Sequence, residues 1–185
     1  MLQKEKLIDS KNIYDGSIIK VRVDTIEAQN GHIAPREIVE HPGGVGVVAL
    51  MQNGNVCMVR QYRRPLDDFL LEIPAGKLNW GEEPFGCAVR ELEEETGYKA
   101  KNYRYLGQIC PTPGFCNEII HIYLATDLIK GEANPDEDEF VEVEEYSIDE
   151  LCDMIMEGTI IDAKTIVGVL KARLILTQEE DFACT

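Results

Sequence analysis

Alternating apolar and polar residues predict a β-hairpin near the start of the chain. Residues 17–28 and 33–40 alternate on either side of Gln29-Asn30-Gly31-His32, and Asn-Gly between two such segments favours a tight hairpin turn. The sequence His41-Pro42-Gly43-Gly44 then breaks the pattern. We therefore expect a separate β element at the N-terminus.

A second hairpin is expected where the main sheet begins. Residues 45–51 and 55–62 form two apolar segments that flank Asn53-Gly54. A loop with two prolines, Pro111-Thr112-Pro113-Gly114, separates two later segments with strand-like patterns and should be stiff. The further strands are predicted at residues 69–73, 103–110, 118–128 and 140–146.

The boundaries of one helix can be inferred from local signals. Pro84 suits the first helical position and Gly97 suits the left-handed position after the last turn, so this helix should span residues 84–96. At about 100° per residue, its apolar residues form one stripe that we expect to face the core. The residues of this stripe are Phe85, Ala88, Val89 and Leu92.

Two further helices are predicted later in the chain. Ser147 and Glu150 have the spacing of a capping box, which predicts a helix directly after Ser147. Apolar residues at helical spacing predict a last helix over residues 163–176, with Asp162 as its N-cap. The sequence contains no internal repeat and no low-complexity stretch.

Composition excludes several classes of protein. The 185 residues suffice for one ordinary domain with a small additional element, and 44% hydrophobic and 28% charged residues are near globular averages. A net charge of −16 would repel nucleic acid and anionic membranes. An anionic substrate would therefore need a bound cation to neutralise it.

The first residues and the cysteines indicate a cytoplasmic protein. Residues 1–12 lack the apolar run of a secretory signal, and the longest apolar stretch, at residues 45–51, is too short to span a bilayer. The six cysteines are scattered, with no Cys-x-x-Cys pair, so we interpret them as reduced thiols.

Three glutamates on the helix at residues 84–96 are candidate metal ligands. Glu91, Glu94 and Glu95 are three or four residues apart, which brings like charges within about 5–6 Å of each other and costs about 0.2–0.5 kcal/mol per pair. A divalent cation would offset this repulsion, because magnesium prefers hard oxygen ligands. A run such as Glu93-Glu94-Glu95 taken alone is more often a solvated face, so the surrounding sequence decides.

The surrounding sequence resembles a known family motif. Residues 76–98, GKLNWGEEPFGCAVRELEEETGY, resemble a complete box of the Nudix hydrolase family. The resemblance implies a Nudix-type α/β/α sandwich with a mixed sheet, and hence an α/β fold. It also divides the chain into an N-terminal β element for dimerisation, residues 1–41, and a Nudix hydrolase domain, residues 42–185.

The same resemblance implies a metal site. Glu91, Glu94 and Glu95 would hold Mg²⁺, with Mn²⁺ also possible, and the backbone carbonyl of Ala75 would join them. Arg90 would orient the carboxylates through charge-assisted hydrogen bonds. Glu82 would support this arrangement without binding the metal.

Further segments are similar to the ADP-ribose pyrophosphatase subfamily. Pro113 lies sixteen residues after Gly97, an offset typical of that subfamily, and Gly114 and Glu118 are the neighbouring candidates for substrate contact. Arginine grips phosphate oxygens with a planar fork. By resemblance, Arg36 and Arg63 would bind the diphosphate.

The resemblance also implies the reaction and its base. The substrate would be ADP-ribose, cut at its diphosphate to AMP and ribose 5-phosphate by a homodimer. Either Glu137 or Glu139 would accept the proton of the attacking water. Alternatives are another nucleotide sugar such as GDP-mannose, a dinucleoside polyphosphate, and a sensor that binds nucleotides without turnover.

Overall fold

The computed structural model describes residues 1–134 and 140–183 and divides them into two compact units. The first unit comprises residues 1–43 and 110–119. The second comprises residues 44–109 and the chain from residue 120 onward.

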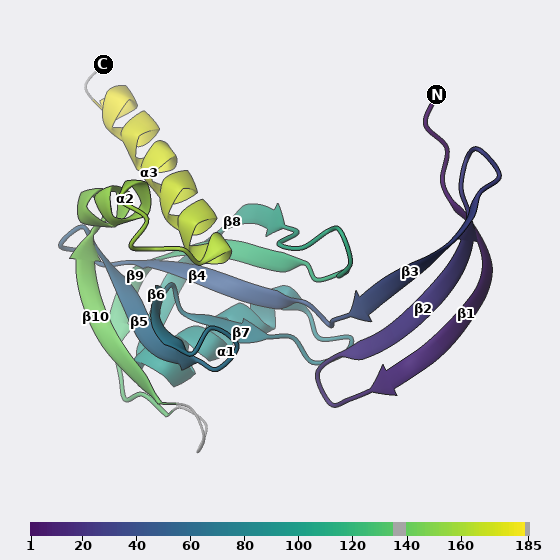
Figure 1. Cartoon of the computed structure of the whole chain (residues 1–185). Helices are drawn as coiled ribbons and strands as arrows, with labels where there is room; N and C mark the ends of the chain where they lie inside the picture. The colour runs from purple at the N-terminus through teal and green to yellow at the C-terminus, as the bar shows by residue number, and fades with distance from the viewer. Residues whose placement is uncertain (135–139, 184–185) are drawn as a thin grey trace. The chain divides into compact units, whose positions relative to one another are not determined.

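The first unit is built on a three-stranded antiparallel sheet of order β1-β2-β3 (Figure 1). The hairpin predicted around Asn30-Gly31 is confirmed, and Gly31 has the positive φ of 81° that a tight turn requires. The sequence analysis missed the third strand. The strands are β1 (Lys6–Asp15), β2 (Lys20–Glu27) and β3 (Ile33–Glu40).

Strand β1 escaped prediction because its register is interrupted twice. Irregularities fall between Leu7 and Asp9 and between Asn12 and Tyr14, where an extra residue shifts the phase of the side chains. Ile8 and Ile13 occupy these positions, so apolar residues follow one another in pairs instead of alternating. The period-2 pattern is lost although the strand pairs along its whole length.

The second unit contains a seven-stranded mixed sheet of order β10-β5-β4-β9-β8, with β6 paired to β5 and β7 paired to β4. Only β4 and β9 are parallel among the described pairs of this sheet. The mixed sheet confirms the fold class. The strands are β4 (Gly44–Leu50), β5 (Asn55–Arg63), β6 (Asp68–Glu72), β7 (Ala75–Lys77), β8 (Tyr98–Ile109), β9 (Ile120–Lys130) and β10 (Val141–Ser147).

Three helices cover the two faces of this sheet, α1 on one face and α2 and α3 on the other (Figure 1). Helix α1 (Pro84–Thr96) has the predicted bounds, with proline at its start and Gly97 at φ 72° after its end. The predicted capping box opens α2 (Ile148–Met156). Helix α3 (Ala163–Ala183) starts as predicted but continues past residue 176, because good helix formers such as Gln and Glu extend a helix beyond its apolar stripe.

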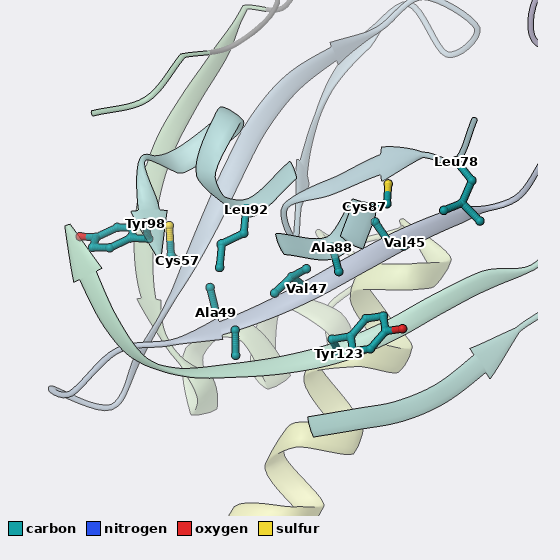
Figure 2. Close-up of a cluster of buried hydrophobic side chains, with 11 residues drawn as sticks. Val45, Val47, Ala49, Cys57, Leu78, Cys87, Ala88, Leu92, Tyr98 and Tyr123 are labelled. Carbon is teal, nitrogen blue, oxygen red and sulfur yellow. The ribbon is translucent and has the colours of Figure 1, made fainter. Parts of the chain in front are cut away.

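Strand β4 forms the centre of the core because both of its faces are buried. Val45, Val47 and Ala49 point towards Ala88 and Leu92 of α1 (Figure 2), and Val48 packs in the cluster on the opposite side with residues of α2 and α3. This burial explains why β4 is apolar without alternation. The strand thereby fixes the distance between α1 and α3.

One prediction about α1 is wrong. Phe85 does not belong to the core stripe, since its side chain is 53% exposed and contacts the ring of Tyr103 edge-on. The buried face is rotated towards the acidic residues of the helix and includes Glu91 and Glu95. A backbone N–H of the sheet, that of Ala75, faces this side of α1 and donates to Glu95.

Candidate active site

Helix α1 buries two carboxylates. Glu91 is 7% exposed and Glu95 is 2% exposed, and they lie four residues apart on the helix face that also carries Ala88 and Leu92. A buried carboxylate is costly unless charge and hydrogen bonds compensate it. The contacts of these two residues therefore define the site.

Both carboxylates contact the start of strand β7. The Oε2 atom of Glu95 accepts a hydrogen bond of 2.9 Å from the Ala75 N–H. The Glu91 carboxyl lies directly against Gly76, where a Cβ atom would come within 1.9 Å of its Cδ atom. Any side chain at residue 76 would displace Glu91, so only glycine fits.

Arg90 lies among the acidic groups. Its Nη1 atom donates to Glu91 Oε1 at 2.8 Å and to Glu94 Oε2 at 2.9 Å, and its Nη2 atom lies 3.5 Å from Glu82 Oε1. Desolvation opposes the charged form, but the charge of Glu91 and the hydrogen bond with Glu94 raise the pKa of the Arg90 guanidinium. Arg90 thus stays cationic and neutralises the carboxylates around it.

Glu82 is ordered by the loop before α1. Its Oε2 atom accepts hydrogen bonds from the backbone N–H of Asn79 at 2.8 Å and from the Asn79 side chain at 3.2 Å. These bonds, together with the charge of Arg90, hold the pKa of Glu82 below its usual value. Glu82 reaches Glu91 and Glu94 only through Arg90, the geometry expected for a supporting residue.

The donor set fits a hard divalent cation by its chemistry. Three carboxylates, those of Glu91, Glu94 and Glu95, project from adjacent turns of one helix, and oxygen ligands of this kind suit Mg²⁺ and Mn²⁺. Within residues 1–134 and 140–183, however, no three acidic, histidine or cysteine side chains converge as a metal cage. Glu91 and Glu94 share the guanidinium of Arg90, and Glu95 contacts Ala75 through the N–H.

A second buried carboxylate site involves Arg63, which was a predicted substrate contact. The Nε and Nη2 atoms of Arg63 each donate a hydrogen bond of 2.7 Å to Glu72, whose side chain is 1% exposed. The Nζ atom of Lys164, at the start of α3, donates to the same Glu72 oxygen as Arg63 Nη2. Two cations therefore hold one buried anion.

The start of α3 also holds the backbone next to Glu72. The Oγ1 atom of Thr165 accepts a hydrogen bond of 2.9 Å from the Ile73 N–H. Asp162 accepts hydrogen bonds from the backbone and the hydroxyl of Thr165 and lies 3.1 Å from the Lys164 ammonium. Residues 72–75, which run from the end of β6 to the start of β7, are thus held by α3 at Glu72 and Ile73 and by α1 at Ala75.

The sequence analysis missed Glu72 and Lys164, although two signals pointed to them. Glu72 interrupts the apolar segment Leu71-Glu72-Ile73, and a buried strand position seldom carries a charge without a partner. Lys164 lies in the first turn of a helix, where the helix dipole disfavours a cation. Each of these two charges is favourable because it contacts the other, and Arg63 and Asp162 add further partners.

The remaining substrate candidates belong to the first unit. Arg36 donates to Glu5, with an Nε to Oε2 distance of 3.2 Å, and its Nη1 atom donates to the Pro35 carbonyl. Glu118 lies 3.4 Å from His41 Nδ1, and Gly114 is in an exposed turn. Arg36, Gly114 and Glu118 thus belong to the first unit, whereas Arg63 belongs to the second.

The two candidates for the catalytic base, Glu137 and Glu139, lie outside the described residues. Their assignment stays a prediction. The five described cysteines are free thiols. In the described part of the chain, no helix is long and apolar enough to cross a membrane.

The network around Glu72 generates a prediction about stability and pH. Desolvation alone would raise the pKa of the Glu72 carboxyl, but the hydrogen bond with Arg63 and the charge of Lys164 lower it below 4.5. The carboxylate therefore stabilises the fold fully above about pH 5 and loses this contribution as pH falls through the folded-state pKa.

We expect Glu72→Gln to lower the free energy of unfolding at pH 7 by about 3 kcal/mol, because two cations lose a buried partner. The difference from the wild type should shrink below pH 4.5. Urea unfolding between pH 3 and pH 8 measures it, with Glu93→Gln as the control, since Glu93 pairs with Lys99 at an exposed position. A difference that stayed constant down to pH 3 would contradict the assignment.

Family models match nearly the whole chain. A NUDIX domain model matches residues 40–167, and a model of the nucleoside diphosphate sugar hydrolase N-terminal domain matches residues 5–39. The two matches adjoin each other. Together they cover residues 5–167.

Similar proteins cover the chain almost end to end. A methanol dehydrogenase activator of Bacillus methanolicus is 46% identical, covering 91% of this chain and 92% of its own. An ADP-ribose pyrophosphatase of Bacillus subtilis strain 168 is 43% identical, covering 90% and 91%. The solved structure of an ADP compounds hydrolase superposes with a TM-score of 0.85 at 21% identity over 97% of both chains, which shows a shared fold.

Proposed function

The chain belongs to the Nudix family, and from this premise we propose that it hydrolyses the diphosphate of ADP-ribose to AMP and ribose 5-phosphate. The observation that carries the proposal is the pair of buried carboxylates on α1, held against Ala75 and Gly76. The name of the B. subtilis relative supports the choice of substrate. Members of the family generally use divalent metals.

The metal ligands we propose are the side chains of Glu91, Glu94 and Glu95 and the carbonyl of Ala75. A divalent cation held there, Mg²⁺ or Mn²⁺, neutralises the diphosphate, polarises its P–O bonds and makes water more acidic. The protein itself orients the carboxylates that would bind the cation. The Ala75 N–H fixes one oxygen of Glu95, and the close fit of Glu91 on Gly76 fixes its carboxyl group.

Arg90 orients the carboxylates of Glu91 and Glu94. By donating to both Glu91 and Glu94, it holds the two carboxylates near each other without contacting the substrate. Glu82 holds Arg90 from the other side. This arrangement supports the orienting role expected from the sequence.

Arg63 can bind a phosphate while it is paired with Glu72. A guanidinium has five N–H donors, and Glu72 takes one from Nε and one from Nη2. Among the described residues Nη1 has no hydrogen-bond partner, so the Nη1 and Nη2 end of the fork remains for two phosphate oxygens. The hydrogen bond with Glu72 and, to a smaller extent, the charge of Glu95 raise the pKa of the Arg63 guanidinium, which supports a role for Arg63 beside the carboxylates of α1.

The reaction is a substitution at phosphorus. The oxygen of a water molecule forms a bond to one phosphorus atom, the bridging P–O bond breaks, and its electron pair leaves with the other phosphate. A carboxylate, Glu137 or Glu139 in our proposal, takes the proton of the water. Arg36, Gly114 and Glu118 are proposed to contact the rest of the substrate.

We also propose that the enzyme is a cytoplasmic homodimer formed through its N-terminal sheet. Strand β1 lies at one edge of that sheet, and Leu7, Ile8, Ile13 and Tyr14 are each at least 50% exposed. An edge strand with apolar side chains is a ready surface for pairing with another chain.

A product assay tests the proposed function. The purified chain with Mg²⁺ should release equal amounts of AMP and ribose 5-phosphate from ADP-ribose, and chelation by EDTA should stop the reaction. GDP-mannose and a dinucleoside polyphosphate, offered in parallel at equal concentration, should give lower kcat/KM. Faster turnover of either, with no AMP from ADP-ribose, would overturn the choice of substrate.

Glu95→Gln should lower kcat/KM for ADP-ribose by at least about 100-fold while the fold is kept. The amide still accepts from the Ala75 N–H, but it lacks the charge that a metal ligand needs. The matched control is Glu93→Gln on the exposed side of the same helix. Circular dichroism checks the fold, and near-normal turnover of the Glu95 variant would argue against the metal assignment.

Sedimentation tests the dimer. The wild type should sediment at about twice the chain mass of 20.8 kDa, because burial of the apolar β1 residues stabilises association. The double substitution Leu7→Glu and Ile13→Glu should shift it to the mass of one chain. If both proteins sedimented alike, β1 would not be the interface.

A further inference from the structure

Lys164 lies in a position with no role in the functional site described so far. It is the second residue of α3, and its side chain is 11% exposed. Helix α3 covers the face of the sheet opposite to α1 (Figure 1). A buried lysine in the first turn of a helix is doubly unfavourable, because of desolvation and because of the helix dipole. Its partners must compensate both costs.

The partners of Lys164 connect it to Arg63. Its Nζ atom donates to Glu72 Oε2, and the same oxygen accepts from Arg63 Nη2 at 2.7 Å. The second Glu72 oxygen accepts from Arg63 Nε, also at 2.7 Å. Lys164 thus contacts the carboxylate that binds the Nε and Nη2 edge of the Arg63 guanidinium.

The backbone next to Glu72 is held by α3, the helix that carries Lys164. Thr165, the residue after Lys164, accepts from the N–H of Ile73, the residue after Glu72. Asp162 bonds both Thr165 and Lys164, so the first turn of α3 is itself rigid. Glu72 therefore has little freedom in either its backbone or its side chain.

From this chain of contacts we propose that Lys164 and Glu72 are positioning residues, which hold the Arg63 guanidinium with its Nη1 and Nη2 end directed at the substrate phosphates. The inference rests on the proposed function, in which Arg63 grips the diphosphate. Without Lys164 one Glu72 oxygen loses a cation, and the carboxylate rotates away from the fork. Arg63 then reaches its phosphate only after an unfavourable reorganisation.

This role predicts a particular kinetic effect. Arg63 binds a phosphate in the ground state and the transition state alike, so its misplacement should weaken binding more than it slows chemistry. A merely structural role would instead reduce the fraction of folded enzyme, which lowers apparent kcat and leaves KM unchanged. KM and kcat for ADP-ribose therefore separate the two explanations.

The test compares Lys164→Met, Lys164→Arg, Arg63→Ala and the double variant Lys164→Met with Arg63→Ala. We expect Lys164→Met to raise KM about tenfold with kcat reduced less than about threefold, and Lys164→Arg to restore most of the loss. In the Arg63→Ala background, Lys164→Met should change KM by less than about twofold, because residues that act through one another are not additive.

Lys171→Met is the matched control. Lys171 is another partly buried lysine of α3, and it donates to the Leu106 carbonyl at 2.7 Å, away from Glu72. Its removal should leave KM within about twofold of the wild type. Equal KM effects of Lys164→Met and Lys171→Met, or full additivity with Arg63→Ala, would overturn the inference.

A readout that needs no substrate separates this inference from the proposed function. The NMR signal of the Arg63 Nε–H, assigned by its loss in Arg63→Lys, should exchange slowly with water in the wild type and much faster in Lys164→Met. If ADP-ribose is not hydrolysed but this change occurs, the substrate assignment fails and the positioning role stands. If the exchange rate is the same in both proteins, the positioning role is refuted.

Discussion

The burial of negative charge beside one short segment of backbone is the constraint on which this structure depends. Glu72, Glu91 and Glu95 are each less than a tenth exposed, and each contacts or belongs to the segment between residues 72 and 76. Buried carboxylates are tolerated only with fixed partners. The partners come from three directions: the backbone of the segment, Arg90 of α1, and the Arg63 and Lys164 side chains.

This constraint explains the orientation of α1. Counting apolar residues around the helix places Phe85 at the core, but the structure exposes Phe85 and buries Glu91 and Glu95. The carboxylates can take the buried face because the Ala75 N–H and the bare backbone at Gly76 receive them. The resulting geometry holds two carboxylates of α1 against the backbone of Ala75 and Gly76.

Features that depend on neighbouring residues were predictable from the sequence, whereas contacts between residues far apart in the sequence were not. The bounds of α1 were predictable because Pro84 and Gly97 are local signals, and the hairpin at Gly31 was predictable for the same reason. The pairing of Glu72 with Lys164 was not, because it joins residues 92 positions apart through side chains. Likewise, the sequence identifies Arg63 as a phosphate-binding candidate but cannot say which of its N–H groups are already engaged.

The sequence distance between Glu72 and Lys164 also orders events during synthesis. When the strands up to β7 have left the ribosome, Glu72 can pair with Arg63, but its second cation is still to be translated. A long-range contact of this kind is slow to form and late in the folding of a nascent chain. The proposed positioning of Arg63 is thereby coupled to docking of the last helix, so a partly made chain would lack one of the two cations that hold Glu72.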